Sequence, residues 1–246
     1  MATYNEEKNL SACLESVKDL ADEIVIVDGT STDKTVEIAK NYKAKVVIKD
    51  NPPIFHINKQ RAIDLATKDW ILQLDADERV SRELKEEIKT KIGRSGINGY
   101  WIPRKNWFLG RFLMKGGQYP DYTLRLYRKG KGKLPQKSVH EQAKVLGKTD
   151  HLENPLIHMA DLNFSRYLIR FDRYTDLIEA ELKEKKIGFG FIPLVKYLFF
   201  LPASWFFLTY IRHKGFMDSW QGFVFSFFSS LRFPVSYIKY LKSLYV

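Results

Sequence analysis

The sequence predicts an α/β protein with a Rossmann-like, mostly parallel sheet, helices on both faces of that sheet, and a C-terminal helical region. Short runs of Val and Ile alternate with segments of helical period through the first half of the chain. Acidic side chains directly follow two of these runs. Beyond residue 160 the composition becomes aromatic, basic and strongly apolar. We therefore predict a catalytic domain at 1–160 and a helical, membrane-associating region at 161–246.

The early elements follow a regular order. Leu10, Cys13, Leu14 and Val17 recur at helical spacing and predict the first helix. The later elements are predicted as a strand at 24–28, a helix through 36–39, a strand at 46–48, a helix at 57–66 and a strand at 70–74. Such alternation favours parallel strands joined by right-handed crossovers. Cys13 is the single cysteine, so we predict a packing role for it and a reducing compartment.

Charge narrows the classes of partner. The formal net charge is +11, and 14% of the residues are aromatic. This balance suits an anionic partner, which can be a nucleic acid, an anionic lipid or a phosphorylated substrate.

The strand at 70–74 ends in the acidic residues Asp75, Asp77 and Glu78. Open α/β sheets bind ligands at the carboxyl ends of their strands. Two carboxylates one residue apart can bind one hard divalent cation, and Mg²⁺ commonly combines one or two carboxylates with substrate phosphates. The alternative is a solvated acidic helix start, because Asp and Glu also favour a first helical turn. Both interpretations stay open at this point.

Asp28 ends the strand at 24–28, where its carboxylate can accept a hydrogen bond from a ribose hydroxyl or a base N–H. Thr3 and Tyr4 can flank the base. The alternative for Asp28 is ordinary turn chemistry, because Asp followed by Gly is a common turn signal.

Three motifs carry a resemblance to a known family. TYNEEKNL (3–10), IVIVDGTSTDKT (24–35) and DWILQLDADE (69–78), in that order, resemble the nucleotide-sugar domain of family 2 glycosyltransferases with a GT-A fold. GGQYPDYTLRLYRKG (116–130), SVHE (138–141) and HKGFMDSWQGF (213–223) resemble its lipopolysaccharide core branch of the beta-1,4-glucosyltransferase type.

The resemblance implies roles for matching residues. Tyr4, Glu6 and Asp28 would contact the nucleoside of a nucleotide-diphosphate sugar, most simply a UDP-sugar. Asp75 would lie near the ribose or diphosphate, and Asp77 would bind Mg²⁺ or Mn²⁺.

Three further residues are candidates on the same grounds. Lys59 and Arg61 lie on the helix where relatives keep a basic residue near the phosphates, although Ala62 replaces the usual Asn after Arg61. A solvated helix face is the alternative for both. His158 can complete the metal shell, as a downstream His does in several GT-A enzymes. Its alternative is a packed histidine.

An inverting transfer needs a general base within reach of the acceptor hydroxyl, and a carboxylate is the usual solution. Glu141 and Asp121 both lie beyond the metal motif, in loops predicted to border a strand at 123–127. We favour Glu141 because it follows that strand. A turn role after Pro120 is the alternative for Asp121.

The C-terminal region suits a lipid surface. Aromatic and aliphatic residues alternate with Arg166, Arg170 and Arg173 at helical spacing. Residues 191–211 are long enough to cross a bilayer, but Lys196 and two prolines interrupt them. We predict interfacial attachment to an anionic membrane. A spanning or re-entrant hairpin and a soluble helical cap are the alternatives.

These features together predict sugar transfer to a lipid-linked saccharide at the cytoplasmic face of the inner membrane, in lipopolysaccharide or other cell-envelope glycan synthesis. One rival is a basic nucleic-acid-binding protein, suggested by Trp101, Trp107 and Tyr119 among Lys and Arg. The acidic cluster at 75–78 counts against it. The other rival is an inactive GT-A scaffold.

Only Met1 and Ala2 precede the first motif, whereas relatives reach it through an apolar strand. In a sheet of order 3-2-1-4 that strand would lie between those at 24–28 and 70–74. We therefore expect a start upstream of Met1, with roughly five to ten more residues, the length of one strand. The alternative is that Met1 and Ala2 pair as a short stub.

Overall fold

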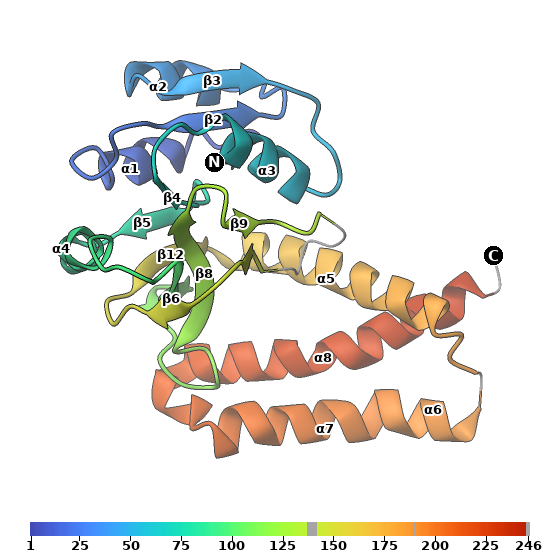
Figure 1. Ribbon diagram of the computed structural model, residues 1–246. Helices are drawn as coiled ribbons and strands as arrows, with labels where there is room; N and C mark the ends of the chain where they lie inside the picture. Colours follow the sequence, from blue (N-terminus) through green and yellow to red (C-terminus); the bar gives the residue numbers. More distant parts are fainter. Residues whose placement is uncertain (137–141, 189, 245–246) are drawn as a thin grey trace. The chain divides into compact units, whose positions relative to one another are not determined.

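The computed structural model describes residues 1–136, 142–188 and 190–244. The chain forms two compact units (Figure 1). Unit 1 comprises Met1–Arg104 and Asp121–Met159, and unit 2 comprises Lys105–Pro120 and Ala160–Val246. The division into two domains at residue 160 stays a prediction, and residues 105–120 group with the helical unit.

The first half of unit 1 is built on parallel strands. β1 (Ala2–Thr3), β2 (Val25–Asp28) and β3 (Lys45–Ile48) pair in the order β1-β2-β3, all parallel. Every residue of β2 is buried, which explains its unbroken apolar sequence. The connecting helices are α1 (Leu10–Glu15), α2 (Thr35–Asn41) and α3 (His56–Leu65), near the predicted positions.

Met1 and Ala2 pair with β2 as a short stub. The N-terminal ammonium of Met1 donates to the Val25 carbonyl at 2.8 Å, and the Met1 carbonyl accepts from the Val27 amide at 3.0 Å. Within the described part of the chain, β1 has no ladder with β4 (Trp70–Leu72). Among the described residues the strands form separate sheets, and the predicted single sheet of order 3-2-1-4 is not observed.

The second sheet is mainly antiparallel, with the order β4-β8-β6-β12-β5, and β7 and β11 also pair with β6. Its members are β4, β5 (Glu78–Val80), β6 (Gly99–Phe108), β7 (Arg111–Phe112), β8 (Asp121–Arg128), β11 (Thr149–His151) and β12 (Leu156–Asp161). A separate hairpin pairs β9 (Gly132–Lys133) with β10 (Lys144–Val145). β11 pairs with β6 in parallel.

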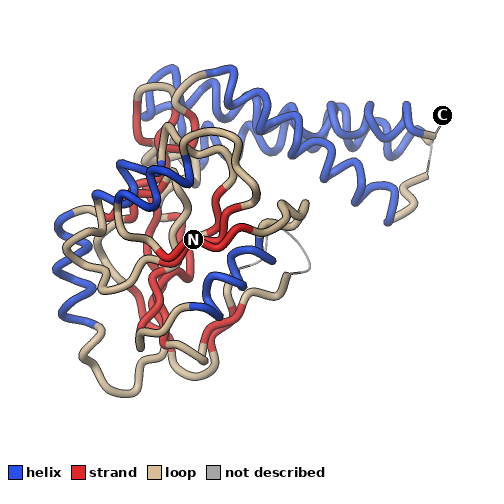
Figure 2. Tube along the Cα trace, turned by 90° about the horizontal axis from the view of Figure 1, so that it is seen from above, coloured by secondary structure: helices blue, strands red, loops and turns tan. Residues whose placement is uncertain are grey.

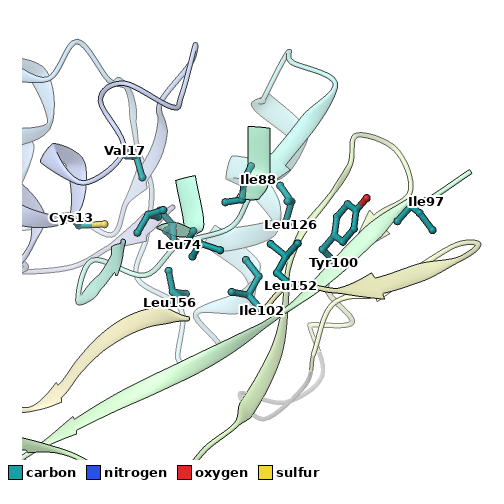
Figure 3. Close-up of a cluster of buried hydrophobic side chains, with 12 residues drawn as sticks. Cys13, Val17, Leu74, Ile88, Ile97, Tyr100, Ile102, Leu126, Leu152 and Leu156 are labelled. Atoms are coloured by element: carbon teal, nitrogen blue, oxygen red, sulfur yellow. The ribbon is translucent and has the colours of Figure 1, made fainter. Parts of the chain in front are cut away.

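The main core of unit 1 joins this second sheet to two helices (Figure 3). Tyr100, Ile102 and Leu126 of the sheet pack with Ile88 of α4 (Arg82–Lys91). Cys13 of α1 lies in the same cluster and is fully buried, which confirms its packing role. Burial raises the pKa of the Cys13 thiol to about 12, so this thiol is unreactive at neutral pH.

Unit 2 is a set of long helices. α5 (Phe164–Glu184) contains the predicted amphipathic segment. The helical stretch Phe191–Arg212 consists of α6 (Phe191–Val195), a π-helical segment (Lys196–Phe200), α7 (Leu201–Phe206) and a second π-helical segment (Phe207–Arg212). A 3₁₀ turn (Gly215–Asp218) leads into α8 (Ser219–Ser243). Within this unit, α8 lies between α5 and α7 (Figures 1 and 2).

Candidate functional site

The loop after β1 is tied to the loop after β2. Asp28 is fully buried, and its carboxylate accepts from the Thr3 hydroxyl at 2.8 Å. It also accepts from the Ser31 amide at 2.8 Å and the Ser31 hydroxyl at 2.6 Å. These are the turn bonds that were the alternative for Asp28. They fix the carboxyl end of β2 against the start of the chain.

The rest of the first motif is held by the same loops. The Asn5 amide donates to the Ser31 hydroxyl at 2.9 Å, and the Glu6 amide donates to the Thr35 hydroxyl at 2.7 Å. The Tyr4 side chain remains exposed. The structure thus gathers the four residues predicted to meet the nucleoside, Thr3, Tyr4, Glu6 and Asp28, into one loop region.

Asp75, in the loop after β4, lies between two cations. One carboxylate oxygen forms an ion pair with the Lys59 ammonium of α3, and the other accepts from the Arg125 guanidinium of β8 at 2.8 Å. Burial opposes ionisation of Asp75, but Arg125 and Lys59 outweigh it and hold the pKa of this carboxyl well below its usual range. Burial lowers the pKa of the Lys59 ammonium, and the negative charge of Asp75 raises it. Asp75 is therefore an anion between two buried cations.

The charge network continues through Glu78. This side chain is fully buried, accepts from the Asp75 amide at 2.9 Å and pairs with Arg125 at 2.9 Å. Arg104 lies 3.7 Å from Glu78 and donates to Asp121 through Nε at 2.9 Å and Nη2 at 2.7 Å. Carboxylates and cations thus alternate from Lys59 to Asp121. Glu78 lies in a strand, so the interpretation as a solvated helix start is wrong for this residue.

Arg61 points elsewhere. Its guanidinium donates to the Asp50 carboxylate and to the Asn58 side-chain oxygen, each at 2.8 Å, and its side chain is partly exposed. Of the two basic residues predicted near the phosphates, the structure brings Lys59 to Asp75 and directs Arg61 to Asp50.

Asp77 and His158 face each other. Oδ2 of Asp77 lies 3.6 Å from Nε2 of His158, and both side chains are largely buried. The pairing of β12 with β5 positions them, because His158 lies opposite Glu78 in the ladder. The carbonyl of Asp77 also accepts from the Met159 amide at 2.8 Å. A carboxylate oxygen and an imidazole nitrogen at this separation fit two ligands of one divalent cation.

The predicted three-ligand set is not gathered. Both oxygens of Asp75 are bonded to cations, and the described residues contain no group of three or more potential metal-binding side chains. A metal ion at Asp77 and His158 would therefore need further ligands from a substrate or water, as Mg²⁺ commonly has.

Asp121 and Glu141 are the two candidates for the general base. Asp121 is the first residue of β8, not a loop residue, and its carboxylate is held by Arg104. Glu141 lies outside the described residues.

Sequence reasoning missed Arg125 and Arg104 and gave Glu78 no specific partner. Arg125 carried no clear signal, because alternation with Leu124 and Leu126 places it on the opposite face of the strand, where a charged side chain is ordinarily solvated. Its burial follows from the neighbouring carboxylates of Asp75 and Glu78.

Comparisons with known proteins find similar glycosyltransferases. The family model "Glycosyl transferase family 2" matches residues 1–144. The lipopolysaccharide core biosynthesis glycosyltransferase LpsC of Rhizobium meliloti (strain 1021) is 28% identical over 93% of this chain and 88% of that protein. An uncharacterized glycosyltransferase of Rickettsia bellii (strain RML369-C) is 46% identical, but over only 35% of this chain and 29% of that protein.

A solved structure extends the likeness to the fold. The mannosyltransferase PcManGT of Pyrobaculum calidifontis, in complex with GDP-Man and Mn²⁺, matches 98% of this chain and 85% of that chain. The TM-score is 0.57 at 12% identity. This likeness confirms the predicted GT-A class of α/β fold. With the family model covering more than half of the sequence, the chain belongs to glycosyl transferase family 2.

Proposed function

We propose that the protein is a metal-dependent, inverting transferase that moves a sugar from a nucleotide-diphosphate donor to a saccharide acceptor. The observation that carries this proposal is the Asp77–His158 pair, 3.6 Å apart, with Asp77 two positions after Asp75 and its two buried cations. A site with a metal-ligand pair and two cations suits a diphosphate, whose charge increases as the glycosidic bond breaks.

Asp77 and His158 would hold Mg²⁺ or Mn²⁺, which as a Lewis acid stabilises the charge of the departing nucleoside diphosphate. PcManGT, which shares the fold, was solved with a nucleotide sugar and Mn²⁺. Lys59 and Arg125 keep Asp75 ionised and hold it in the loop after β4. We propose that Asp75 accepts a hydrogen bond from a hydroxyl group of the nucleotide sugar. Tyr4, Glu6 and Asp28 shape the nucleoside site.

The general base is the one role for which we propose two candidates. Glu141→Gln is expected to retain donor binding and lose transfer, whereas Asp121→Asn is expected to retain more activity, because Arg104 already engages that carboxylate. Calorimetric titration with the nucleotide diphosphate would measure binding, and acceptor-dependent turnover would measure transfer. Greater loss of turnover in Asp121→Asn would identify Asp121 as the base.

The acceptor is proposed from the likeness to LpsC. Similarity to a lipopolysaccharide core glycosyltransferase over nearly the whole chain supports a cell-envelope saccharide as the acceptor. We propose that this saccharide is held on lipid at the cytoplasmic face of the inner membrane. A panel of radiolabelled nucleotide sugars tests the donor class. We expect one UDP-sugar to be turned over faster than the others. No turnover of any nucleotide sugar by folded protein with Mn²⁺ present would contradict the proposal and favour an inactive scaffold.

A further inference from the structure

One side of the helical stretch Phe191–Arg212 is apolar and exposed. The 18-residue window of highest hydropathy has none of its residues buried in the structure. We call this side the apolar stripe. Its apolar members are Phe191, Ile192, Val195, Phe199, Phe200, Phe207 and Ile211, with exposed fractions between 36% and 80%. The exposed side chains of Lys196 and Ser204 lie among them.

The stripe stays on one side because the helix is not a uniform α-helix. Its members recur at intervals of about four residues, whereas an α-helix turns by about 400° in four residues. In a uniform α-helix the stripe would therefore rotate by about 40° at each repeat and pass to the opposite side within five repeats. The π-helical segments Lys196–Phe200 and Phe207–Arg212 have wider turns, which offset this rotation.

The opposite side of the same helix packs within unit 2. Tyr197 stacks on Tyr237 of α8 at 5.0 Å between ring centroids, and Trp205 meets Phe233 at 6.0 Å. Leu194 and Leu198 join the same cluster as Tyr237. The helix thus has one side packed against α8 and a largely apolar side that stays exposed.

Charge identifies the occupant of the exposed side. From Lys185 to the end of the sequence the single acidic residue is Asp218. Asp218 is buried and accepts from the Met114 and Lys115 amides at 2.9 and 2.6 Å. The same stretch carries eight basic residues, which are Lys185, Lys186, Lys196, Arg212, Lys214, Arg232, Lys239 and Lys242. A second copy would bring like charges together, whereas an anionic lipid surface attracts them.

We propose that the apolar stripe is immersed in the interface of an anionic bilayer, with the axis of the helix in the membrane plane. This inference rests on the proposed membrane-held acceptor and specifies the surface that meets the lipid. An in-plane helix needs one apolar side, as this one has, while a spanning helix meets lipid or apolar protein on every side.

The neighbouring helices oppose a spanning arrangement. α8 packs along α5, where Lys239 bonds to Asp172 and Asp176, each at 2.6 Å. α5 carries further charges on its other positions, among them Arg166, Arg173 and Glu181. If 191–212 crossed the bilayer, the helices packed alongside it would bring these charges to the level of the hydrocarbon, at high cost.

The first test removes apolar side chains from the stripe. The variant Phe199→Ser/Phe200→Ser is compared with Ile48→Ser/Leu146→Ser, which removes similarly exposed aliphatic side chains from unit 1. Sedimentation with phosphatidylethanolamine–phosphatidylglycerol vesicles measures partitioning. We expect the stripe variant to bind at least about tenfold more weakly and the control variant to bind like the wild type. Equal partitioning of the two variants would overturn the proposal.

Donor turnover with a soluble saccharide acceptor separates this inference from the proposed function. The stripe variant is expected to turn over at the wild-type rate, because the site lies in unit 1. If the wild-type protein turns over the donor but does not bind vesicles, the membrane-binding role of the stripe is refuted and the proposed transferase function stands. If the wild-type protein binds vesicles but does not turn over the donor, the proposed transferase function is refuted and the membrane-binding role of the stripe stands.

The second test measures depth and stays informative if the double variant misfolds. Single cysteines replace Ile192, Phe200 and Phe207 and carry a fluorescent label, while the buried Cys13 stays unlabelled. Lipids brominated at different depths then quench the label. An in-plane helix predicts the same depth at all three positions. A deepest position at Phe200 would show a spanning helix, and a lipid-free dimer with unquenched labels would show a second copy as the occupant. Either result overturns the proposal.

Discussion

Asp77→Asn is expected to abolish sugar transfer while leaving the fold intact. The substitution keeps the side-chain volume but removes the charge of the oxygen that lies 3.6 Å from His158. Loss of metal-ion stabilisation amounts to several kcal/mol of the barrier, so we expect turnover to fall by about a thousandfold or more. Steady-state turnover at saturating donor measures the effect, and thermal unfolding checks the fold.

Asp19→Asn is the matched control, because Asp19 is an exposed residue whose carboxylate lies 4.0 Å from the Lys85 ammonium. It is expected to keep normal turnover. Near-normal turnover of Asp77→Asn at saturating Mn²⁺ would disprove the metal assignment. His158→Ala should weaken Mn²⁺ binding in the same direction, which electron paramagnetic resonance of Mn²⁺ would detect without any measure of activity.

Arg125→Met is expected to cause the largest loss of stability. Arg125 is buried and pairs with both Asp75 and Glu78, so its removal leaves two carboxylates in a site of low polarity with fewer cations. Breaking a buried ion pair by removing one partner typically costs about 3–5 kcal/mol. Urea unfolding monitored by circular dichroism measures the change in the free energy of unfolding.

Arg61→Met provides the comparison for this prediction. Arg61 pairs with Asp50 at the surface, where ion pairs contribute about 0–1 kcal/mol. The two variants remove the same group and add the same side chain, so the difference between them isolates the effect of burial. An equal, small change in both would show that the Asp75–Arg125–Glu78 cluster does not stabilise the fold.

The local elements of unit 1 were largely predictable from the sequence. The strand predicted at 24–28 is Val25–Asp28 in the structure, and the helix predicted at 57–66 is His56–Leu65. Period and turn residues determine such elements within a few positions of the chain. The carboxyl ends of β2 and β4 were found for the same reason, because an apolar run followed by Asp is a local pattern.

Partners distant in sequence were not predictable. Arg125 meets Asp75 because Leu72 of β4 pairs with Leu126 of β8, and the register of two strands cannot be read from either strand alone. For Lys59 and Arg61 the sequence predicted the helix but not which of the two side chains reaches Asp75. Two residues apart, they point about 200° from each other around α3, so a single site can receive only one of them. The sequence did not indicate which.

The geometry of the long helix in unit 2 was also beyond local pattern. Hydropathy predicted an apolar segment at 191–211, but its separation into a packed side and an exposed side depends on the contacts of Tyr197 and Trp205 with α8.

Acceptor-dependent turnover of a radiolabelled nucleotide sugar, with EDTA and then with excess Mn²⁺, tests the central claim most directly. If Asp77 and His158 hold a metal ion for glycosyl transfer, turnover falls to background in EDTA and returns when Mn²⁺ is added. Asp77→Asn should show no return under the same conditions. Undiminished turnover in EDTA by the metal-stripped protein would contradict the claim that this enzyme transfers sugars through a metal-bound diphosphate.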